Sequence, residues 1–176
     1  MNNLRYPIGE FQASSNLNVA RVQDLIIELE QIPTQLRAAI AGLSSEQFKT
    51  PYRPGGWTLL EVAQHIPEAH LNVYLRCQHA LIHDNPTILV FLEEAWAAQP
   101  ASRPPLELSL QLSDVIHARL VHLFRSLEPQ QWARTFLHPE SGIQRLDATL
   151  EYYVWHGQHH IAQITSTIER NHWRKP

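Results

Sequence analysis

The sequence predicts an all-α protein, a four-helix bundle in which a long irregular segment connects the second helix to the third. In four long stretches, apolar residues recur every three or four positions, as they do along one face of a helix. The pattern Leu-Ser-Ser-Glu-Gln-Phe at residues 43–48 is echoed by Leu-Glu-Pro-Gln-Gln-Trp at 127–132. Each copy follows a long helix and precedes a turn-rich loop and a helix that contains histidine. Two helix pairs in sequence, with no competing stretch of strand-like alternation, favour a bundle. At 176 residues, we expect one domain over 1–176.

The first helix is predicted over residues 18–41, with an apolar stripe formed by Val22, Leu25, Ile26, Leu29, Ile32, Leu36 and Ile40. Pro33 lies inside this stretch and predicts a kink or a break. Gly42 fits the left-handed cap that ends such a helix. Residues 44–47 have the pattern of a capping box, which predicts a short helix around Phe48.

The second long helix is predicted over residues 58–83, because Thr58 and Glu61 form a second capping box and Asp-Asn-Pro at 84–86 ends the helix. Pro67 lies inside it. Residues 85–105 are irregular, with a short helix expected over 93–98. A loop of this length inside a compact domain is usually functional or mobile.

The third helix begins after Pro105, and its apolar stripe is Leu108, Leu112, Val115, Ile116, Leu120, Leu123 and Leu127. Pro129 suits the first position of a following short helix. Residues 135–145 contain His-Pro-Glu-Ser-Gly, which predicts a turn or a small hairpin. The fourth helix is expected to open with Asp147 as its N-cap and to continue to about Asn171.

Composition excludes several classes of protein. Fourteen basic and seventeen acidic residues give a net charge of −3, which argues against nucleic-acid binding through the phosphate backbone. A single cysteine, Cys77, excludes an internal disulfide and a cysteine-based zinc cluster. The start has no signal-peptide pattern, and the longest aliphatic or aromatic run, residues 88–92, is far too short to span a bilayer. We therefore expect a cytoplasmic protein with no membrane partner.

Eleven histidines stand out in the composition. His156 and His160 are four residues apart, so on a helix they share one face with their Cβ atoms about 5–6 Å apart, close enough to bind one metal ion. A third ligand has to come from another helix, and the second helix offers His65. Such a pair can also be a coincidence of solvated residues. The neighbouring Tyr152, Tyr153, Trp155 and Ile161, however, predict a buried helix, where unpaired histidines are costly.

Three imidazoles without a fourth protein ligand would leave positions open on the metal, as catalytic sites require. All-nitrogen ligation suits Zn, Ni, Co, Cu or Fe and does not suit Mg or Ca. The glutamate that a His-Glu-x-x-His protease places between its histidines is missing here, so that class is excluded. Gly157 is better explained by a close approach between helices.

Beyond these patterns, the chain resembles the YfiT group of the DinB-like superfamily over nearly its whole length. The resemblance rests on residues 6–10, on Tyr-Arg-x-Gly-Gly-Trp-Thr within residues 50–58, on His65, His70, Asn72 and Arg76, and on Trp-His-x-x-His-His within 153–162. It implies an up-down-down-up bundle with one divalent metal per chain, nickel or zinc, on His65, His156 and His160. It also implies a homodimer with a small-molecule substrate, and either hydrolysis or transfer of a low-molecular-weight thiol such as bacillithiol. Gln64 and Gln158 stand where relatives can have further histidines, and Pro67 is inserted into the ligand helix.

Other residues are candidates for supporting or substrate-binding roles. Glu61 and Tyr152 each lie four residues before a predicted ligand and could fix its tautomer, although Glu61 could equally serve the capping box alone. Asn72 and Arg76 continue the His65 face and could meet an anionic substrate, or lie at a surface or interface. His159 points about 100° away from the ligands and is expected to pack or to support them.

The remaining residues are weaker candidates. His117, Arg119 and His138 could also meet a substrate. The histidines taken as solvated or at the edge of the core are His70, His79, His83, His122 and His172. The five tryptophans are expected to anchor the core, and Trp57 and Trp155 could also wall the pocket.

Three functions remain open at this point. The first is an enzyme that uses the metal to activate a thiol for transfer to a small electrophile. The second is a hydrolase of amides or esters that uses metal-activated water. The third is a non-catalytic metal-binding module of a stress response. The lack of an evident carboxylate base beside the histidines slightly favours the thiol, although Glu93 or Glu140 could fold over the site from a loop.

Overall fold

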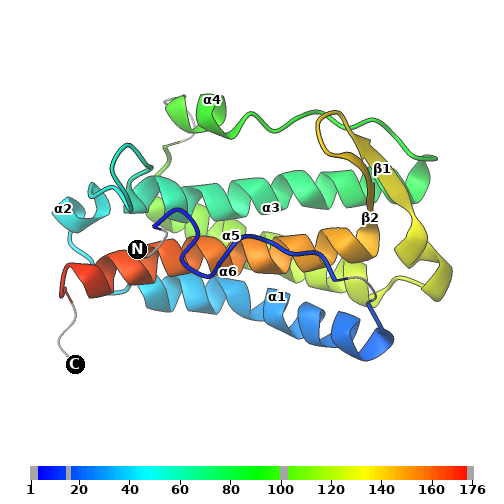
Figure 1. The fold of residues 1–176 in the computed structure, drawn as a ribbon, viewed down its shortest axis with the longest axis horizontal. Helices are drawn as coiled ribbons and strands as arrows, with labels where there is room; N and C mark the ends of the chain where they lie inside the picture. The colour runs from blue at the N-terminus through cyan, green and yellow to red at the C-terminus, as the bar shows by residue number, and fades with distance from the viewer. Residues whose placement is uncertain (1–3, 15–16, 100–102, 174–176) are drawn as a thin grey trace.

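A computed structural model describes residues 4–14, 17–99 and 103–173 of the chain. Four long helices run side by side (Figure 1): α1 (Val19–Ile40), α3 (Leu59–Ile82), α5 (Leu106–Arg125) and α6 (Leu146–Arg170). α1 packs against α5 and α6, and α3 packs against the same two helices. The predicted four-helix bundle is therefore confirmed.

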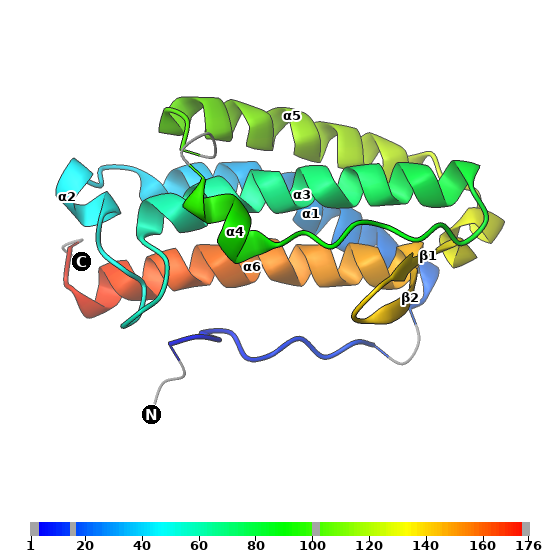
Figure 2. The same ribbon diagram turned by 90° about the horizontal axis from the view of Figure 1, so that it is seen from above.

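The bundle has the up-down-down-up order. α1 and α6 run one way and α3 and α5 the other, because the segment between α3 and α5 returns along the outside of the bundle before α5 begins (Figures 1 and 2). This crossover contains the short helix α4 (Glu93–Ala98), as predicted. Its start is fixed to the hairpin, because Ile88 N donates to Leu137 O at 3.1 Å and Leu137 N donates to Pro86 O at 2.9 Å.

The smaller elements also agree with the sequence patterns. Ser44 caps α2 (Ser45–Phe48), and Thr58 caps α3, each through a complete capping box. Pro129 opens the 3₁₀ helix η2 (Pro129–Ala133). The turn region is an antiparallel hairpin of β1 (Thr135–His138) and β2 (Gly142–Arg145), which is the larger of the two expected structures.

Two details differ from the expectations. α1 continues through Pro33 without the break that was one of the two expectations there, because Pro33 and its neighbours on the helix face are buried and the packing maintains the helix. Asp147 is not the N-cap of α6: the cap position is Arg145, at the end of β2. Leu146 N donates to Arg134 O at 3.1 Å, so the hairpin fixes where the helix starts. Asp147 lies in the first turn, where its carboxylate accepts from Arg145 Nη2 at 2.7 Å.

The core lies along the bundle axis between the four helices. Fully buried side chains come from each of them, including Leu29, Ile32, Leu36, Leu59, Ile66, Leu120, Leu150 and Ile164. Gly157 on α6 lies against α1: a Cβ there would meet Ile32 Cδ1 at 2.5 Å. The predicted close approach of two helices at Gly157 is thus confirmed, and it brings α6 and its histidines deep into the bundle.

The N-terminal segment, residues 4–14, runs along the outer face of α6 (Figure 2). It is fastened near both ends. The carbonyl of Arg5 accepts from Gln163 Nε2 at 3.0 Å, and the backbone N–H of Ser14 donates to the buried carboxylate of Glu151 at 3.0 Å. Among the described residues, no helix is both long and apolar enough to cross a membrane.

Candidate metal centre

Three histidine side chains from two neighbouring helices meet inside the bundle. His65 comes from α3, and His156 and His160 lie one turn apart on α6. One ring nitrogen of each residue lies within 4.8 Å of the other two. His65 Nε2 and His156 Nε2 lie 3.2 Å apart. The structure therefore brings together the three residues that spacing selected as candidate ligands.

Burial controls the charge of this cluster. His65, His156 and His160 are only 3%, 5% and 9% exposed. Burial lowers the pKa of His65 to about 3, and the nearby His159 imidazole adds to the effect. Burial followed by repulsion from neighbouring imidazoles holds the pKa values of His156 and His160 well below their ordinary range. All three rings are therefore neutral at physiological pH, which is the form that binds metals.

The tautomer of His160 follows from its hydrogen bonds. The Arg5 carbonyl can only accept, so the Gln163 atom 3.0 Å away is the amide nitrogen. The amide oxygen of Gln163 then faces His160 Nδ1 at 2.9 Å and accepts its proton. This leaves the lone pair of His160 on Nε2. Gln163 Nε2 also lies 2.9 Å from His159 Nε2, so one amide connects the cluster with the N-terminal segment.

The second nitrogen of His156 lies against another histidine of α3. His156 Nδ1 is 3.3 Å from His70 Nε2. His70 was expected to be solvated or at the edge of the core, and this expectation is wrong, because His70 is fully buried. Its position on α3 faces the bundle interior, where its imidazole satisfies the polar atom of His156. Tyr152, the alternative candidate for this role, lies with its ring centroid 6.1 Å from that of His156.

The spacing and chemistry of the three histidines fit a transition-metal ion. Two nitrogens that each lie about 2.0–2.1 Å from a shared ion at a tetrahedral angle are about 3.3 Å apart, close to the 3.2 Å between His65 and His156. The donor set is entirely imidazole nitrogen, which suits Zn or Ni. The orientation of His160 also fits, because its Nδ1 proton is taken by Gln163 and its Nε2 is left to coordinate.

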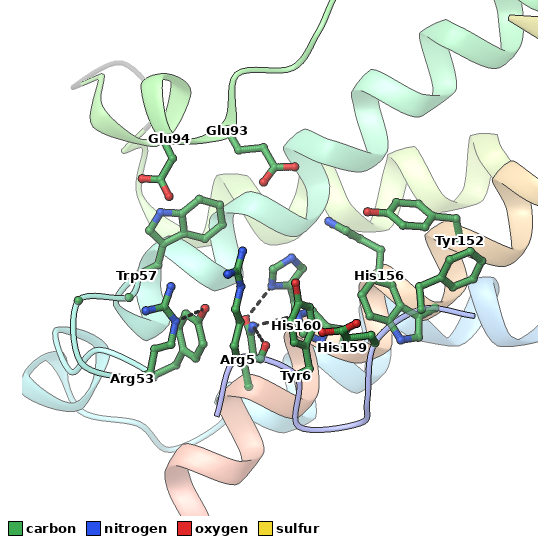
Figure 3. Close-up of a pocket in the computed structure, with 17 residues that line it drawn as sticks. Arg5, Tyr6, Arg53, Trp57, Glu93, Glu94, Tyr152, His156, His159 and His160 are labelled. Carbon is green, nitrogen blue, oxygen red and sulfur yellow. Dashed lines mark hydrogen bonds between the residues drawn. The ribbon is translucent and has the colours of Figure 1, made fainter. Parts of the chain in front are cut away.

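Two cavities open onto this cluster. The smaller, about 360 Å³, lies between α6, the loop before α3 and the N-terminal segment, and is lined by His156, His160, Arg5 and Arg53. Figure 3 shows this pocket, with Glu93 and Glu94 reaching toward it from α4. The larger, about 830 Å³, extends toward the hairpin. Both are lined by Phe11, Glu93, Glu94, Tyr152 and His156.

Aromatic rings surround the histidines on the cavity side. The Trp57 ring lies 4.6 Å from that of His65, and Phe91 from the crossover stacks on His65 at 6.0 Å. Trp155 lines the smaller cavity and stacks on His159 at 4.7 Å. These contacts shield the cluster from bulk water and support the view that Trp57 and Trp155 wall the pocket.

Two other candidates have structural partners of their own. Glu61 Oε2 accepts from the backbone N–H of Thr58 at 2.9 Å, as a capping-box carboxylate does, and Glu61 also pairs with Arg103 at 3.4 Å. Asn72 Nδ2 donates to the carbonyl of Glu68 one turn earlier. The structure does not bring Glu61 or Asn72 to the lining of either cavity.

The candidates that do reach the cavities are Arg76, Tyr152 and His159. Arg76 is 9% exposed and lines the larger cavity; its guanidinium donates to Tyr153 Oη at 3.3 Å and to the Leu89 carbonyl at 3.2 Å. Tyr152 lines both cavities, and His159 lines the smaller one. Of the weaker candidates, His138 lines the larger cavity, whereas His117 is buried in the bundle.

Sequence reasoning missed Gln163, Arg5, Arg53 and the role of His70. Gln163 carried one available signal, since a glutamine three residues after a ligand on a buried helix face must find polar partners. Arg5 and Arg53 carried none, because their place depends on how an irregular segment folds back onto α6.

Comparisons with known proteins agree with the fold, and the names of the relatives point to metal-dependent enzymes. The family model of the DinB superfamily matches residues 28–164. A Bacillus mycoides protein named "Putative metal-dependent hydrolase" is 44% identical over 98% of this chain and its own whole length, and a Bacillus cereus protein of the same name is 43% identical over the same shares.

Solved structures give the same result. The structure of YfiT from Bacillus subtilis, described as a probable metal-dependent hydrolase with an unusual four-helix bundle topology, has a TM-score of 0.94 and 37% identity, covering 98% of this chain and 99% of that one. TT2238, a four-helix bundle protein, has a TM-score of 0.56 at 23% identity, covering 80% of this chain and 94% of that one, and shows the shared fold alone. The chain therefore belongs to the DinB superfamily and is a YfiT-like member of it.

Proposed function

We propose that this protein is a metal-dependent enzyme in which His65, His156 and His160 hold one divalent transition metal, Zn or Ni, and that it transfers a low-molecular-weight thiol of the bacillithiol type to a small electrophile. The metal-dependent part is supported by the names of the relatives and by the convergence of three neutral imidazoles. A divalent metal bound there would lower the pKa of a thiol or of water near it.

The observation that carries the transferase is the pair of cavities that meet at His156. A hydrolase needs space for one organic substrate beside water, whereas group transfer needs two organic substrates to reach one point from different sides. The volumes of about 360 and 830 Å³ each suit a small molecule.

The residues that line the two cavities suit different substrates, the thiol in the smaller cavity and the electrophile in the larger one. Arg5 and Arg53 line the smaller one, where their planar guanidinium groups can bind the carboxylates of a thiol cofactor in a bidentate manner. Val90, Phe91 and Phe136 give the larger cavity an apolar wall suited to a hydrophobic electrophile. In the transfer, sulfur loses its proton and forms a bond to an electrophilic carbon, and the leaving group departs with its electron pair.

Hydrolysis of an amide or ester is the second candidate, and Glu93 specifically favours it. The preference for a thiol began with the lack of a carboxylate base, yet Glu93 lines both cavities. Desolvation raises its pKa, with the nearby Glu94 adding to the effect, and a raised pKa suits a carboxylate that must exchange a proton near neutral pH. The names of the relatives also favour hydrolysis.

One set of assays tests the two candidates together. The metal content of the purified protein is measured first, and the loaded protein is then incubated with bacillithiol and a chlorinated aromatic, and separately with a panel of amides and esters. Thiol-dependent loss of the electrophile, with a raised KM for the thiol in Arg53→Ala, supports the transferase. Turnover of an ester that falls in Glu93→Gln supports the hydrolase instead.

The control variant for these assays is His122→Ala, which removes an exposed histidine on α5. Absence of stoichiometric metal would overturn both candidates. Metal binding without turnover in either assay would favour a non-catalytic metal-binding module. The homodimer and the cytoplasmic location stay predictions, and light scattering of the purified protein tests the first.

A further inference from the structure

Behind the metal centre, two further histidines are buried in the bundle interior without contact with either cavity. His70 on α3 is fully buried and His117 on α5 is 1% exposed. Their ring centroids lie 4.6 Å apart. One nitrogen of each, His70 Nδ1 and His117 Nε2, finds no hydrogen-bond partner among the residues that the structure describes. Buried imidazole nitrogens are normally paired, so this juxtaposition needs an explanation.

The protonation of these histidines can be worked out by starting from His117, the one farther from the metal centre. His117 Nδ1 lies 2.8 Å from the carbonyl of Ser113. A carbonyl oxygen can only accept, so His117 carries its proton on Nδ1, and its Nε2 is left with a lone pair. The unpartnered atom of His117 is therefore an acceptor.

The same reasoning then applies to His70. The two unpartnered atoms are not hydrogen-bonded to each other, but they belong to neighbouring buried rings. A proton on His70 Nδ1 would place a donor beside the lone pair of His117, whereas a bare Nδ1 would add a second buried lone pair. With the proton on Nδ1, His70 Nε2 is an acceptor, and it lies 3.3 Å from His156 Nδ1. His156 must in turn carry its proton on Nδ1, which leaves the lone pair of His156 on Nε2, the atom that faces His65 Nε2 at 3.2 Å.

The opposite arrangement is unfavourable at two places. With His70 protonated on Nε2, the two neighbouring rings would each carry a buried, unpartnered lone pair, on His70 Nδ1 and His117 Nε2, with no donor between them. His156 would then be protonated on Nε2, and that proton would point into the space between the three candidate ligands. The carbonyl of Ser113, by fixing the tautomer of His117, thus favours one protonation pattern for the three rings.

We propose that His70 and His117 are positioning residues: together with the Ser113 carbonyl, they fix the tautomer and orientation of His156 so that its Nε2 lone pair faces the metal. This inference deepens the proposed function and rests on His156 being a metal ligand. The metal ligand on α6 is held in a ready form by the folded bundle itself, before any metal binds.

The test begins with the metal-free, histidine-¹⁵N-labelled protein. Long-range ¹H–¹⁵N correlation spectra report which ring nitrogen of each histidine is protonated. We expect Nδ1–H for His156, His70 and His117. A His156 protonated on Nε2, or one that exchanges freely between both forms, would overturn the proposal. This measurement uses the unaltered chain, so it does not depend on whether a variant folds.

A matched pair of variants then tests the effect on metal binding. His70→Leu fills the space without an acceptor, whereas His70→Gln places an amide oxygen near the position of Nε2 and can accept from His156. We expect His70→Leu to mix the His156 tautomers and to weaken Zn²⁺ binding by about 10–100-fold in competition with a chelator. We expect His70→Gln to restore both. Equal loss in the two folded variants, or no loss in either, would contradict the proposal.

His117→Phe tests the remoter link. It removes the buried lone pair beside the His70 ring while keeping an aromatic ring, and we expect a partial shift of the His156 tautomer and a smaller loss of Zn²⁺ affinity than in His70→Leu. No shift at all would show that the chain ends at His70 and would overturn the role of His117. None of these measurements uses turnover, so their failure is distinct from failure of the transferase or hydrolase assays.

Discussion

His156 and His160 lie one turn apart on α6, but the partners of their Nδ1 atoms lie on different helices, Gln163 on α6 itself and His70 on α3. Gln163 holds His160, and the amide of Gln163 is oriented by a carbonyl of the N-terminal segment, at the rim of the smaller cavity. His70 holds His156 from the bundle interior and lines neither cavity. We call Gln163 and the N-terminal segment that orients it the pocket side of the centre. We call His70 and the buried residues around it the core side.

The two ligands of α6 therefore depend on different parts of the fold. The orientation of His156 depends on the packing of the bundle, and that of His160 depends on residues that line the smaller cavity. The core side depends on helices that cannot move without opening the bundle. The pocket side depends on residues 4–14, which contact α6 from outside and are fastened through Gln163 and Glu151. A change on the pocket side can therefore alter substrate access and one ligand while the rest of the centre stays in place.

Removing each ligand of α6 gives the largest expected effect. We expect both His156→Ala and His160→Ala to lose stoichiometric metal, and with it activity, because two imidazoles remain. They should differ in the stability of the metal-free protein. His156→Ala leaves His70 Nε2 buried without a partner, which costs about 1–3 kcal/mol, whereas Gln163 lines the smaller cavity, from which water can reach its amide.

Elemental analysis and urea unfolding measure these two quantities, with His122→Ala as the control that should change neither. If His160→Ala destabilised the metal-free protein as much as His156→Ala, the distinction between the two sides would be wrong.

Acidification gives the next largest effect. It lowers the free energy of unfolding through histidines on both the core side and the pocket side. Burial lowers the pKa of His117, on the core side, and of His159, on the pocket side, to about 4. Between pH 6.5 and about 4 the unfolded chain binds protons that the folded chain does not. Stability is therefore complete above pH 6.5 and falls as the pH falls, by up to about 1.4 kcal/mol per pH unit for each such histidine.

Urea unfolding of the metal-free protein at several pH values measures this slope. We expect His117→Phe and His159→Phe each to flatten it. The variant Gln163→Leu distinguishes the pocket side from the core side. It removes the hydrogen bond to the Arg5 carbonyl and so loosens the N-terminal segment, whose Tyr6 ring packs on His159. An NMR titration should then show the pKa of His159 rising toward its ordinary value while that of His117 stays low. A parallel rise in both would mean that the two sides are coupled.

The sequence predicted the centre where periodic helices decide the geometry. A spacing of four residues places His156 and His160 on one face wherever the helix packs, and the matching position of His65 on the second helix follows from the bundle. The core side was read incorrectly, because the burial of His70 depends on the rotation of α3 against α5 and α6. The pocket side was largely absent from the prediction, since Arg5 reaches Gln163 through an irregular segment without periodicity.

The same distinction applies to the fold. Capping boxes at Ser44 and Thr58 are local patterns, and both helix starts were predicted correctly. The start of α6 was not, because Asp147 resembles an N-cap locally, but the hairpin before it holds Leu146 to the Arg134 carbonyl. A contact between residues twelve apart overrides the local preference.

Substitutions at Gln163 change the hydrogen bonds of the pocket side and leave those of the core side in place. Gln163→Leu removes the acceptor for His160 and the donor for Arg5, and we expect Zn²⁺ affinity to fall by about 10–100-fold. Gln163→Glu keeps an acceptor for His160 but sets a carboxylate against the Arg5 carbonyl. It should retain Zn²⁺ affinity while residues 5–13 exchange their amide hydrogens faster.

Chelator competition and hydrogen exchange measure the two effects separately. Loss of Zn²⁺ affinity in Gln163→Glu equal to that in Gln163→Leu would show that the N-terminal segment, and not the hydrogen bond to His160, is what maintains that ligand.

The smallest expected effect concerns the packing that places α6 in the bundle. Gly157 follows His156 directly, and an added Cβ would meet Ile32 Cδ1 at 2.5 Å. Overpacking a core costs about 1–3 kcal/mol, whereas alanine gains about 1 kcal/mol over glycine within a helix. We therefore expect Gly157→Ala to lower the free energy of unfolding by about 1 kcal/mol.

Ile32→Val removes the clashing Cδ1 atom and leaves only the contacts to Cγ1 and Cγ2 at 3.2 Å, which a shift of a few tenths of an ångström relieves. In that background the same Gly157→Ala change should become stabilising, because the gain in helix propensity remains and the severe clash is gone. Urea unfolding of the four proteins in the double-mutant cycle measures the coupling. The reversal of sign is the decisive result, since general softening of the core would lower stability in both backgrounds. It would show that the close packing of Gly157 against Ile32 limits how near α6 can lie to α1, one residue from a candidate metal ligand.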